Sequence, residues 1–190
     1  MSRLFIFRGP SSSGKSTVEE SIISNGMVAP FVIHTTRAPR PGEESCKPYV
    51  FVDSGSDLPD GIRIDIPGYA SYVYNLAQLD NQQQDLVISI IDDEPISEIV
   101  KALKSVHTEV YIIDFSIPLS VRESLLRNRG DSEDDIKVRL TRGLGEREFN
   151  ASLVLDNIYS ATHKVEAFIR EIQSPSAYRF MAKMSILDIN

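Results

Sequence analysis

Short runs of consecutive apolar residues recur along this chain, separated by longer segments whose apolar residues fall every three or four positions. Unbroken apolar runs are typical of strands buried on both faces of a sheet, and the wider spacing is typical of helices that cover it. Strands are predicted at residues 4–7, 31–33, 49–52, 62–66, 86–91, 110–115 and 153–155, and helices at 15–25, 96–106, 136–149 and 162–172. Residues 120–129 are amphipathic and basic, and residues 78–85 are interpreted as the end of a further helix. In residues 174–190 the apolar positions show no regular spacing.

This alternation predicts an α/β protein with a central parallel sheet flanked by helices. The chain has 190 residues, of which 42% are hydrophobic and 25% are charged. These values suit one globular domain with small inserts. Neither an internal repeat nor a domain linker is visible along the sequence.

The net charge and the cysteine content limit which partners and which cellular compartment the protein is expected to have. The net charge of −7 argues against a broad nucleic-acid-binding face, so any anionic ligand must be held by a local cluster of basic groups. Cys46 is the single cysteine, which excludes an intramolecular disulfide and fits a reducing compartment. No apolar stretch is long enough for a membrane span, and no signal-peptide pattern is present. We therefore expect a cytoplasmic protein with neither a nucleic-acid nor a membrane partner.

Residues 9–17 read GPSSSGKST and match the phosphate-loop pattern G-x-x-x-x-G-K-[ST] at every fixed position. The loop lies between a predicted buried strand and a predicted helix, which is the context that the motif requires. Its backbone N–H groups and the helix N-terminus bind phosphates, the lysine reaches the β- and γ-phosphates, and the serine hydroxyl ligates Mg²⁺. The predicted donor-binding residues are Gly9, Ser11, Ser12, Ser13, Gly14, Lys15, Ser16 and Thr17, with Ser16 also a metal ligand.

A second candidate anion site follows at residues 35–43, TTRAPRPGE. Arg37 and Arg40 stand three apart in a proline-stiffened loop, and their planar guanidinium groups can converge on one phosphate. The prolines restrict the loop and so lower the entropy lost on binding. In an acidic chain, this basic loop is interpreted as an acceptor-phosphate site.

The two loops, followed by YVFV at residues 49–52, resemble the guanylate kinase family, which reads roughly GPSGSGKST, then TTRxPRxGE, then a tyrosine six residues after the glutamate. The resemblance extends over about residues 4–172. It implies a P-loop kinase fold with a core at about 1–33, 76–120 and 150–172, an acceptor-binding insert at 34–75, a helical lid at 121–149 and a tail at 173–190. It also implies ATP and Mg²⁺ as cofactors.

By this resemblance, Arg37, Arg40 and Tyr49 clamp the acceptor phosphate, and Glu43 braces the arginines or lines the site. A further family tyrosine corresponds to Tyr72 or Tyr74, of which Tyr74 is taken as the binding residue.

Residues 127–133, RNRGDSE, resemble the lid of the family. The resemblance gives Arg127, Arg129 and Arg139 a catalytic role, together with Lys15, in neutralising the transferred phosphoryl group. One lid arginine is replaced by Leu125, and Arg122 or Arg127 is the candidate substitute. Residues 153–157 resemble the strand that closes the adenine side, which places Asn157 at the donor nucleotide.

Departures from the family concentrate on reading the base. His34 stands where a serine precedes TTR, and Asp65 is the nearest counterpart of the glutamate that accepts from guanine. After the strand at 86–91, the family has D-x-D. The corresponding residues here are Ser89 and Ile91, with Asp92 just beyond them as the candidate metal ligand.

Three functions follow from these residues. The first is a nucleoside monophosphate kinase that transfers the γ-phosphoryl group of ATP to GMP or dGMP, with less sharp base selection than the family norm. The second is ribose bisphosphate phosphokinase, or a P-loop kinase for another small phosphorylated acceptor. The third, a non-catalytic guanylate-kinase-like binding module, is disfavoured by the intact phosphate loop. A monomer or a homodimer is expected.

Overall fold

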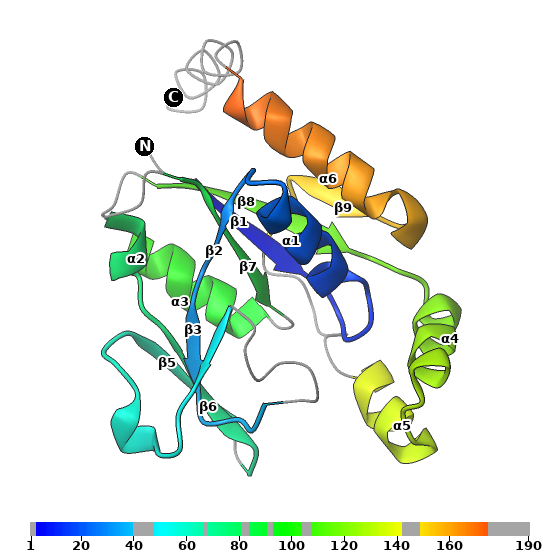
Figure 1. The fold of residues 1–190 in the computed structure, drawn as a ribbon, viewed down its shortest axis with the longest axis horizontal. Helices are drawn as coiled ribbons and strands as arrows, with labels where there is room; N and C mark the ends of the chain where they lie inside the picture. Colours follow the sequence, from blue (N-terminus) through cyan, green and yellow to red (C-terminus); the bar gives the residue numbers. More distant parts are fainter. Residues whose placement is uncertain are drawn as a thin grey trace.

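The computed structural model describes residues 3–39, 48–66, 68–80, 84–90, 93–103, 108–141 and 149–174. Its centre is a five-stranded sheet in which every neighbouring pair is parallel (Figure 1). In spatial order the strands are β2 (Ala29–Pro30), β7 (Leu86–Ile90), β1 (Arg3–Arg8), β8 (Glu109–Phe115) and β9 (Leu153–Leu155). The parallel sheet confirms the predicted α/β class.

Helices cover both faces of this sheet. On one face, α1 (Lys15–Ser24) and α6 (Ile158–Gln173) pack against a core that includes Phe5, Phe7 and Phe115. On the other face, α3 (Asp93–Leu103) packs against a second core that includes Leu4, Ile6 and Ile88. Successive residues of β1 alternate between these two cores, which explains why its apolar run is unbroken.

The strand order places a binding crevice at the end of β1. The chain crosses from β1 to the β7 side of the sheet first, and β8 then pairs with the opposite edge of β1. In open α/β sheets, ligands bind beyond the carboxyl ends of the strands at such a reversal of order. The loop that follows β1 here is the phosphate loop.

A second sheet of four strands lies below the first in Figure 1. Its order is β4 (Tyr49–Phe51), β3 (Ile33–Thr35), β6 (Ala70–Tyr74) and β5 (Ile62–Ile66). The single strand predicted at 31–33 is wrong, because β2 joins the central sheet and β3 joins this one. Strand β6 was not predicted.

The remaining elements are short. A 3-10 turn, η1 (Gly55–Asp57), lies between β4 and β5 in the chain, and α2 (Ala77–Asp80) lies between β6 and β7. Helices α4 (Leu119–Arg129) and α5 (Glu133–Thr141) form a separate helical pair. The predicted helix at 136–149 begins earlier than expected, at Glu133, and residues 142–148 lie outside the described part. The helix expected at 162–172 likewise begins earlier, at Ile158.

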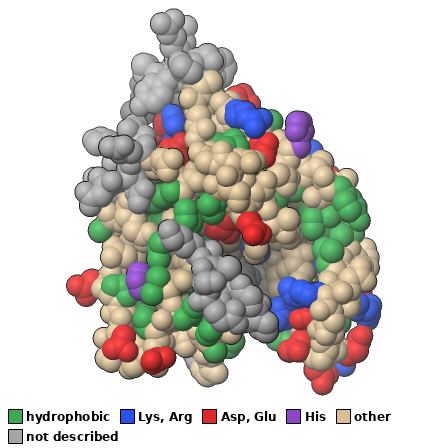
Figure 2. Space-filling view, in the orientation of Figure 1, with side chains coloured by type: hydrophobic (Ala, Val, Ile, Leu, Met, Phe, Trp, Pro, Cys, Tyr) green, Lys and Arg blue, Asp and Glu red, His purple; other side chains and the backbone are tan. Residues whose placement is uncertain are grey.

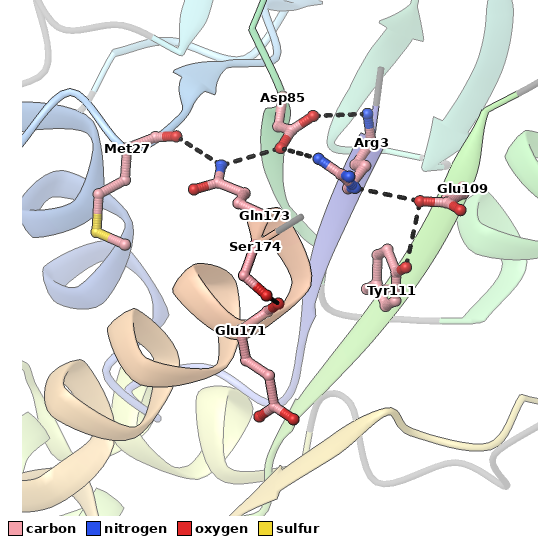
Figure 3. Close-up of polar contacts among 8 residues, drawn as sticks. All are labelled: Arg3, Met27, Asp85, Glu109, Tyr111, Glu171, Gln173 and Ser174. Carbon is pink, nitrogen blue, oxygen red and sulfur yellow. Dashed lines mark hydrogen bonds and ion pairs between the residues drawn. The ribbon is translucent and has the colours of Figure 1, made fainter. Parts of the chain in front are cut away.

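A polar network fastens the sheet at the amino-terminal ends of its strands, opposite the end from which the phosphate loop departs (Figure 3). Asp85 accepts hydrogen bonds from Arg3 Nη1 at 3.2 Å and from Gln173 Nε2 at 2.9 Å. Arg3 Nε also donates to Glu109, and Tyr111 OH donates to the same carboxylate. Burial, together with the Glu109 charge, raises the pKa of Tyr111 to about 12. The network joins β1, β8 and α6, so the strands that carry the site are anchored at their far ends.

Within the described ranges, no helix combines the length and the apolar character needed to span a membrane.

Candidate active site

A cavity of about 310 Å³ opens between the central sheet, the second sheet and the helical pair. Three groups of residues line it together: the phosphate loop, side chains of the second sheet, and two arginines of α4 and α5. Figure 2 shows a hollow in the surface with Lys and Arg side chains gathered beside it, at the lower right. The segments that the sequence assigned to donor, acceptor and lid therefore face one space.

Two glycines of the phosphate loop are required by close packing. A Cβ on Gly9 would lie 2.8 Å from the backbone oxygen of Phe115, and one on Gly14 would lie 2.8 Å from Cδ1 of Ile158. Gly14 also has φ 88°, in the left-handed region that favours glycine. Because Gly14 has no side chain to cap α1, the first N–H groups of the helix stay available to an anion.

The three side chains that follow Gly14 all line the cavity. The ammonium group of Lys15 is buried and donates to the carbonyl oxygens of Gly9 at 2.6 Å and Pro10 at 2.9 Å. A phosphate that enters the loop would replace these carbonyls as the acceptor. Ser16 and Thr17 line the cavity, and Ser16 is exposed to it.

Arg37 and Tyr49, which the sequence assigned to the acceptor phosphate, lie together in the cavity. The guanidinium carbon of Arg37 lies 5.2 Å from the ring centre of Tyr49 and 5.3 Å from that of Phe51. Stacking of this kind fixes the plane of the guanidinium group. Arg37 is only 7% exposed, so burial restricts the side chain further. Tyr72 and Tyr74, two residues apart on β6, both line the cavity.

The helical pair contributes Arg129 and Arg139 to the same cavity. Asp131 pairs with both arginines, at 2.6 Å to Arg129 Nη2 and 3.5 Å to Arg139 Nε, and thereby holds them side by side. Arg127 differs from these two, because it pairs with Glu123 and Glu133 and does not line the cavity. Its Glu133 and Glu123 partners raise the pKa of Arg127.

Arg122 is fully buried and joins the helical pair to the phosphate loop. Its Nε donates to the Ser11 carbonyl at 3.0 Å, and its Nη2 donates to the carbonyls of Arg139 and Leu140. Burial lowers its pKa. The sequence offered Arg122 only as a substitute lid cation, whereas the structure gives it backbone contacts that hold α4 and α5 against the phosphate loop.

His34 and Asp65 are not among the residues that line the cavity, so their predicted reading of the base stays a prediction that this geometry does not favour. Alternate residues of a strand point to opposite faces, and Ile33, Ile64 and Ile66 are the ones that line the cavity. Asp65 is exposed and accepts from Ser71 Oγ and from Arg63 Nε at 2.9 Å. The Ser71 hydrogen bond, aided by Arg63, lowers its pKa. The alternation of residues 62–66, IRIDI, was the sequence signal for this orientation.

Glu19 is a buried acid that the sequence interpretation missed. It lies on α1 with 5% exposure, and its Oε2 accepts from Ser89 Oγ at 2.5 Å. Its other oxygen, Oε1, is buried and has no hydrogen-bond partner among the described residues. Burial raises the pKa of Glu19 to about 7, although the Ser89 hydrogen bond and the Lys15 charge oppose the shift.

The remaining predicted site residues divide into two groups. Asn157 caps α6, with its Oδ1 accepting from the Tyr159 N–H at 2.9 Å, and it lies directly before the Ile158 side chain that contacts Gly14. Arg40, Glu43 and Asp92 lie outside the described residues. The described part of the chain contains no group of three or more His, Cys, Asp or Glu residues that could hold a metal ion.

Comparison with known proteins agrees with this geometry. The family model described as guanylate kinase matches residues 1–172. The guanylate kinase of Desulfotalea psychrophila is 30% identical over 186 residues, covering 88% of each chain. The human guanylate kinase is 27% identical, covering 90% of this chain and 94% of the human one. A crystal structure of guanylate kinase from Anaplasma phagocytophilum matches with TM-score 0.60 at 20% identity, covering 90% of this chain and 86% of that one.

The parallel sheet and its phosphate loop define a P-loop α/β kinase fold. The family match and the Desulfotalea relative show, further, that the chain belongs to the guanylate kinase family.

Proposed function

We propose that this protein transfers the γ-phosphoryl group of ATP to GMP or dGMP, giving ADP and GDP or dGDP. The observation that carries the proposal is the single cavity shared by Lys15 of the phosphate loop, Arg37 of the acceptor side and Arg139 of the lid. A phosphoryl transfer needs two phosphorylated groups held in line and cations around the moving charge, and little covalent help.

In this proposal the phosphate loop holds the donor. The N-terminal N–H groups of α1 and the Lys15 ammonium bind the ATP phosphates, and Ser16 ligates Mg²⁺, with Asp92 as a further candidate ligand. Mg²⁺ supplies charge neutralisation at the β- and γ-phosphates when it is bound. Asn157 lies toward the nucleoside of ATP.

The acceptor phosphate is assigned to Arg37 and Tyr49, with Arg40 and Glu43 of the same loop. Arg37 is stacked on an aromatic ring and cannot swing freely, so its donors are pre-arranged for a phosphate. Arg129 and Arg139, held in place by Asp131, then close on the transferring group.

The acceptor base has an apolar environment within the described residues. Ile33, Ile64 and Ile66 line the cavity beside Tyr72 and Tyr74. Such side chains contact a flat base by dispersion and stacking, which favours purine size over a particular pattern of donors.

Release of ADP, measured with a coupled assay across a panel of acceptors, tests the proposed function. The panel contains GMP, dGMP, AMP, CMP, UMP and ribose 1,5-bisphosphate, each with saturating Mg·ATP. The highest kcat/KM is expected for GMP and dGMP, as family membership implies, with AMP the nearest competitor because the apolar lining favours purine size. A higher kcat/KM for ribose 1,5-bisphosphate, or equal values for all monophosphates, would reject the guanylate acceptor and leave only the P-loop kinase class.

A further inference from the structure

The carboxyl end of β7 carries a hydroxyl where P-loop proteins commonly carry an acid. Ser89 pairs with Phe7 of β1, one residue before Ile90, whose carbonyl accepts from the Gly9 N–H of the phosphate loop. Ser89 also lines the cavity. In P-loop proteins, an aspartate from a neighbouring strand helps to hold Mg²⁺ together with the Ser or Thr of the loop. No carboxylate occupies that strand position here.

Glu19 of α1 places a carboxylate against the Ser89 side chain at the end of β7. It lies three residues after Ser16 and four after Lys15 on α1, a spacing that puts the three side chains on neighbouring positions of one helix face. Its Oε2 is the acceptor for the Ser89 hydroxyl, and its charge interacts with that of Lys15. A glutamate side chain thus links the metal-binding turn of α1 to the end of β7.

The unpartnered oxygen of Glu19 indicates a ligand-dependent role. A buried polar atom without a partner costs about 1–3 kcal/mol, and an ionised one costs more. Packing alone is better served by an apolar residue at this position, which is buried on α1 as Val18 and Ile22 are. Glu19 does not line the cavity itself, so it acts on a bound nucleotide through Ser89, which does.

We propose that Glu19, acting from α1 through Ser89, provides beside the Mg²⁺ site the negative charge that the end of β7 lacks. Glu19 is a positioning residue: it is buried behind Ser89, and its carboxylate orients the Ser89 hydroxyl, which lines the cavity, toward the metal-loaded nucleotide. The proposal rests on the proposed function only in requiring that a Mg·nucleotide binds the phosphate loop.

Binding of ADP, measured by calorimetry with Mg²⁺ and with EDTA, tests the role without using catalysis. The ratio of the two affinities gives the contribution of the metal. In Glu19→Gln this ratio is expected to fall about 10- to 100-fold, as for other residues that support metal ligands, while the affinity in EDTA stays unchanged. Glu20→Gln is the matched control, because Glu20 is the adjacent, exposed residue of the same helix.

A carboxylate exchange separates a metal role from a structural one. The variant Glu19→Gln/Ser89→Asp moves the acid from the helix to the strand and is expected to restore the Mg²⁺ ratio. The variant Asp92→Asn tests the rival acid that follows β7. If Glu19→Gln fails to fold, Ser89→Ala breaks the same link from the strand side and is expected to lower the ratio.

Four results would overturn the proposal: an unchanged ratio in Glu19→Gln, an equal loss in Glu20→Gln, no restoration by the exchange, or a loss in Asp92→Asn alone. Failure of the wild-type protein to bind ADP in either condition would instead reject the proposed donor site.

Discussion

Arg8 and Asp114 form a bidentate ion pair between β1 and β8, with Nε to Oδ1 and Nη2 to Oδ2 both at 2.6 Å. The Arg8 side chain is 1% exposed and also donates to the Phe149 carbonyl at 2.9 Å. Arg8 is the last residue of β1, directly before Gly9. The pair therefore fixes the strand end from which the phosphate loop departs.

Removing one partner of this pair is expected to destabilise the fold strongly. Arg8→Ala leaves Asp114 without its partner, and breaking a buried pair in this way costs about 3–5 kcal/mol. Urea denaturation measures the change. Lys101→Met is the control, because it breaks the exposed Lys101–Glu98 pair and should cost less than about 1 kcal/mol. Equal costs for the two variants would contradict the structural role of Arg8.

The Arg8–Asp114 pair also shows what sequence reasoning could not supply. The apolar run of β1 predicts a buried strand, but nothing local indicates that Arg8 pairs with a residue 106 positions away. Gly9, Lys15 and Ser16 were predictable because their chemistry depends on a contiguous motif. Glu19 was not, because its burial depends on where β7 docks against α1.

Relief of backbone strain at Ser12 is expected to stabilise the protein slightly. Ser12 has φ 60°, and the left-handed conformation costs a non-glycine residue about 1–2 kcal/mol. Glycine avoids this cost, but its greater conformational freedom in the unfolded chain lowers the free energy of unfolding by about 0.5–1 kcal/mol. Ser12→Gly should therefore raise the Tm by about 1–3 °C in a chain of this size. A fall in Tm in a calorimetric scan would show that a Ser12 side-chain contact outweighs the strain.

Loss of Arg122 is expected to uncouple the lid from the phosphate loop. Arg122→Met keeps the length of the side chain but removes the hydrogen bonds to Ser11, Arg139 and Leu140. These hydrogen bonds hold Arg139 in place, and misplacement of a catalytic group by about 1 Å can cost up to about a hundredfold, so kcat should fall at least about tenfold. Arg170→Met, which removes an exposed pair on α6, is the control. Steady-state kinetics in which both variants match the wild type would contradict the coupling.

Weak recognition of the guanine 2-amino group is expected from the orientation of β5. IMP lacks this group, so the ratio of kcat/KM for GMP to that for IMP measures its recognition. Ile64 faces the cavity and Asp65 faces away. Ile64→Glu should therefore raise the ratio about ten- to a hundredfold, whereas Asp65→Asn should leave it unchanged. A collapse of the ratio in Asp65→Asn would restore Asp65 as the base reader.

Transfer of label from [γ-³²P]ATP to GMP tests the central claim most directly, because it follows the phosphoryl group itself. Labelled GDP is expected to form with the wild-type protein and Mg²⁺. Its rate should fall more than about tenfold in Lys15→Ala, since one cation at the transferring group can be worth far more than that. Label released only as inorganic phosphate, or labelled GDP formed equally well by a folded Lys15→Ala variant, would contradict the account.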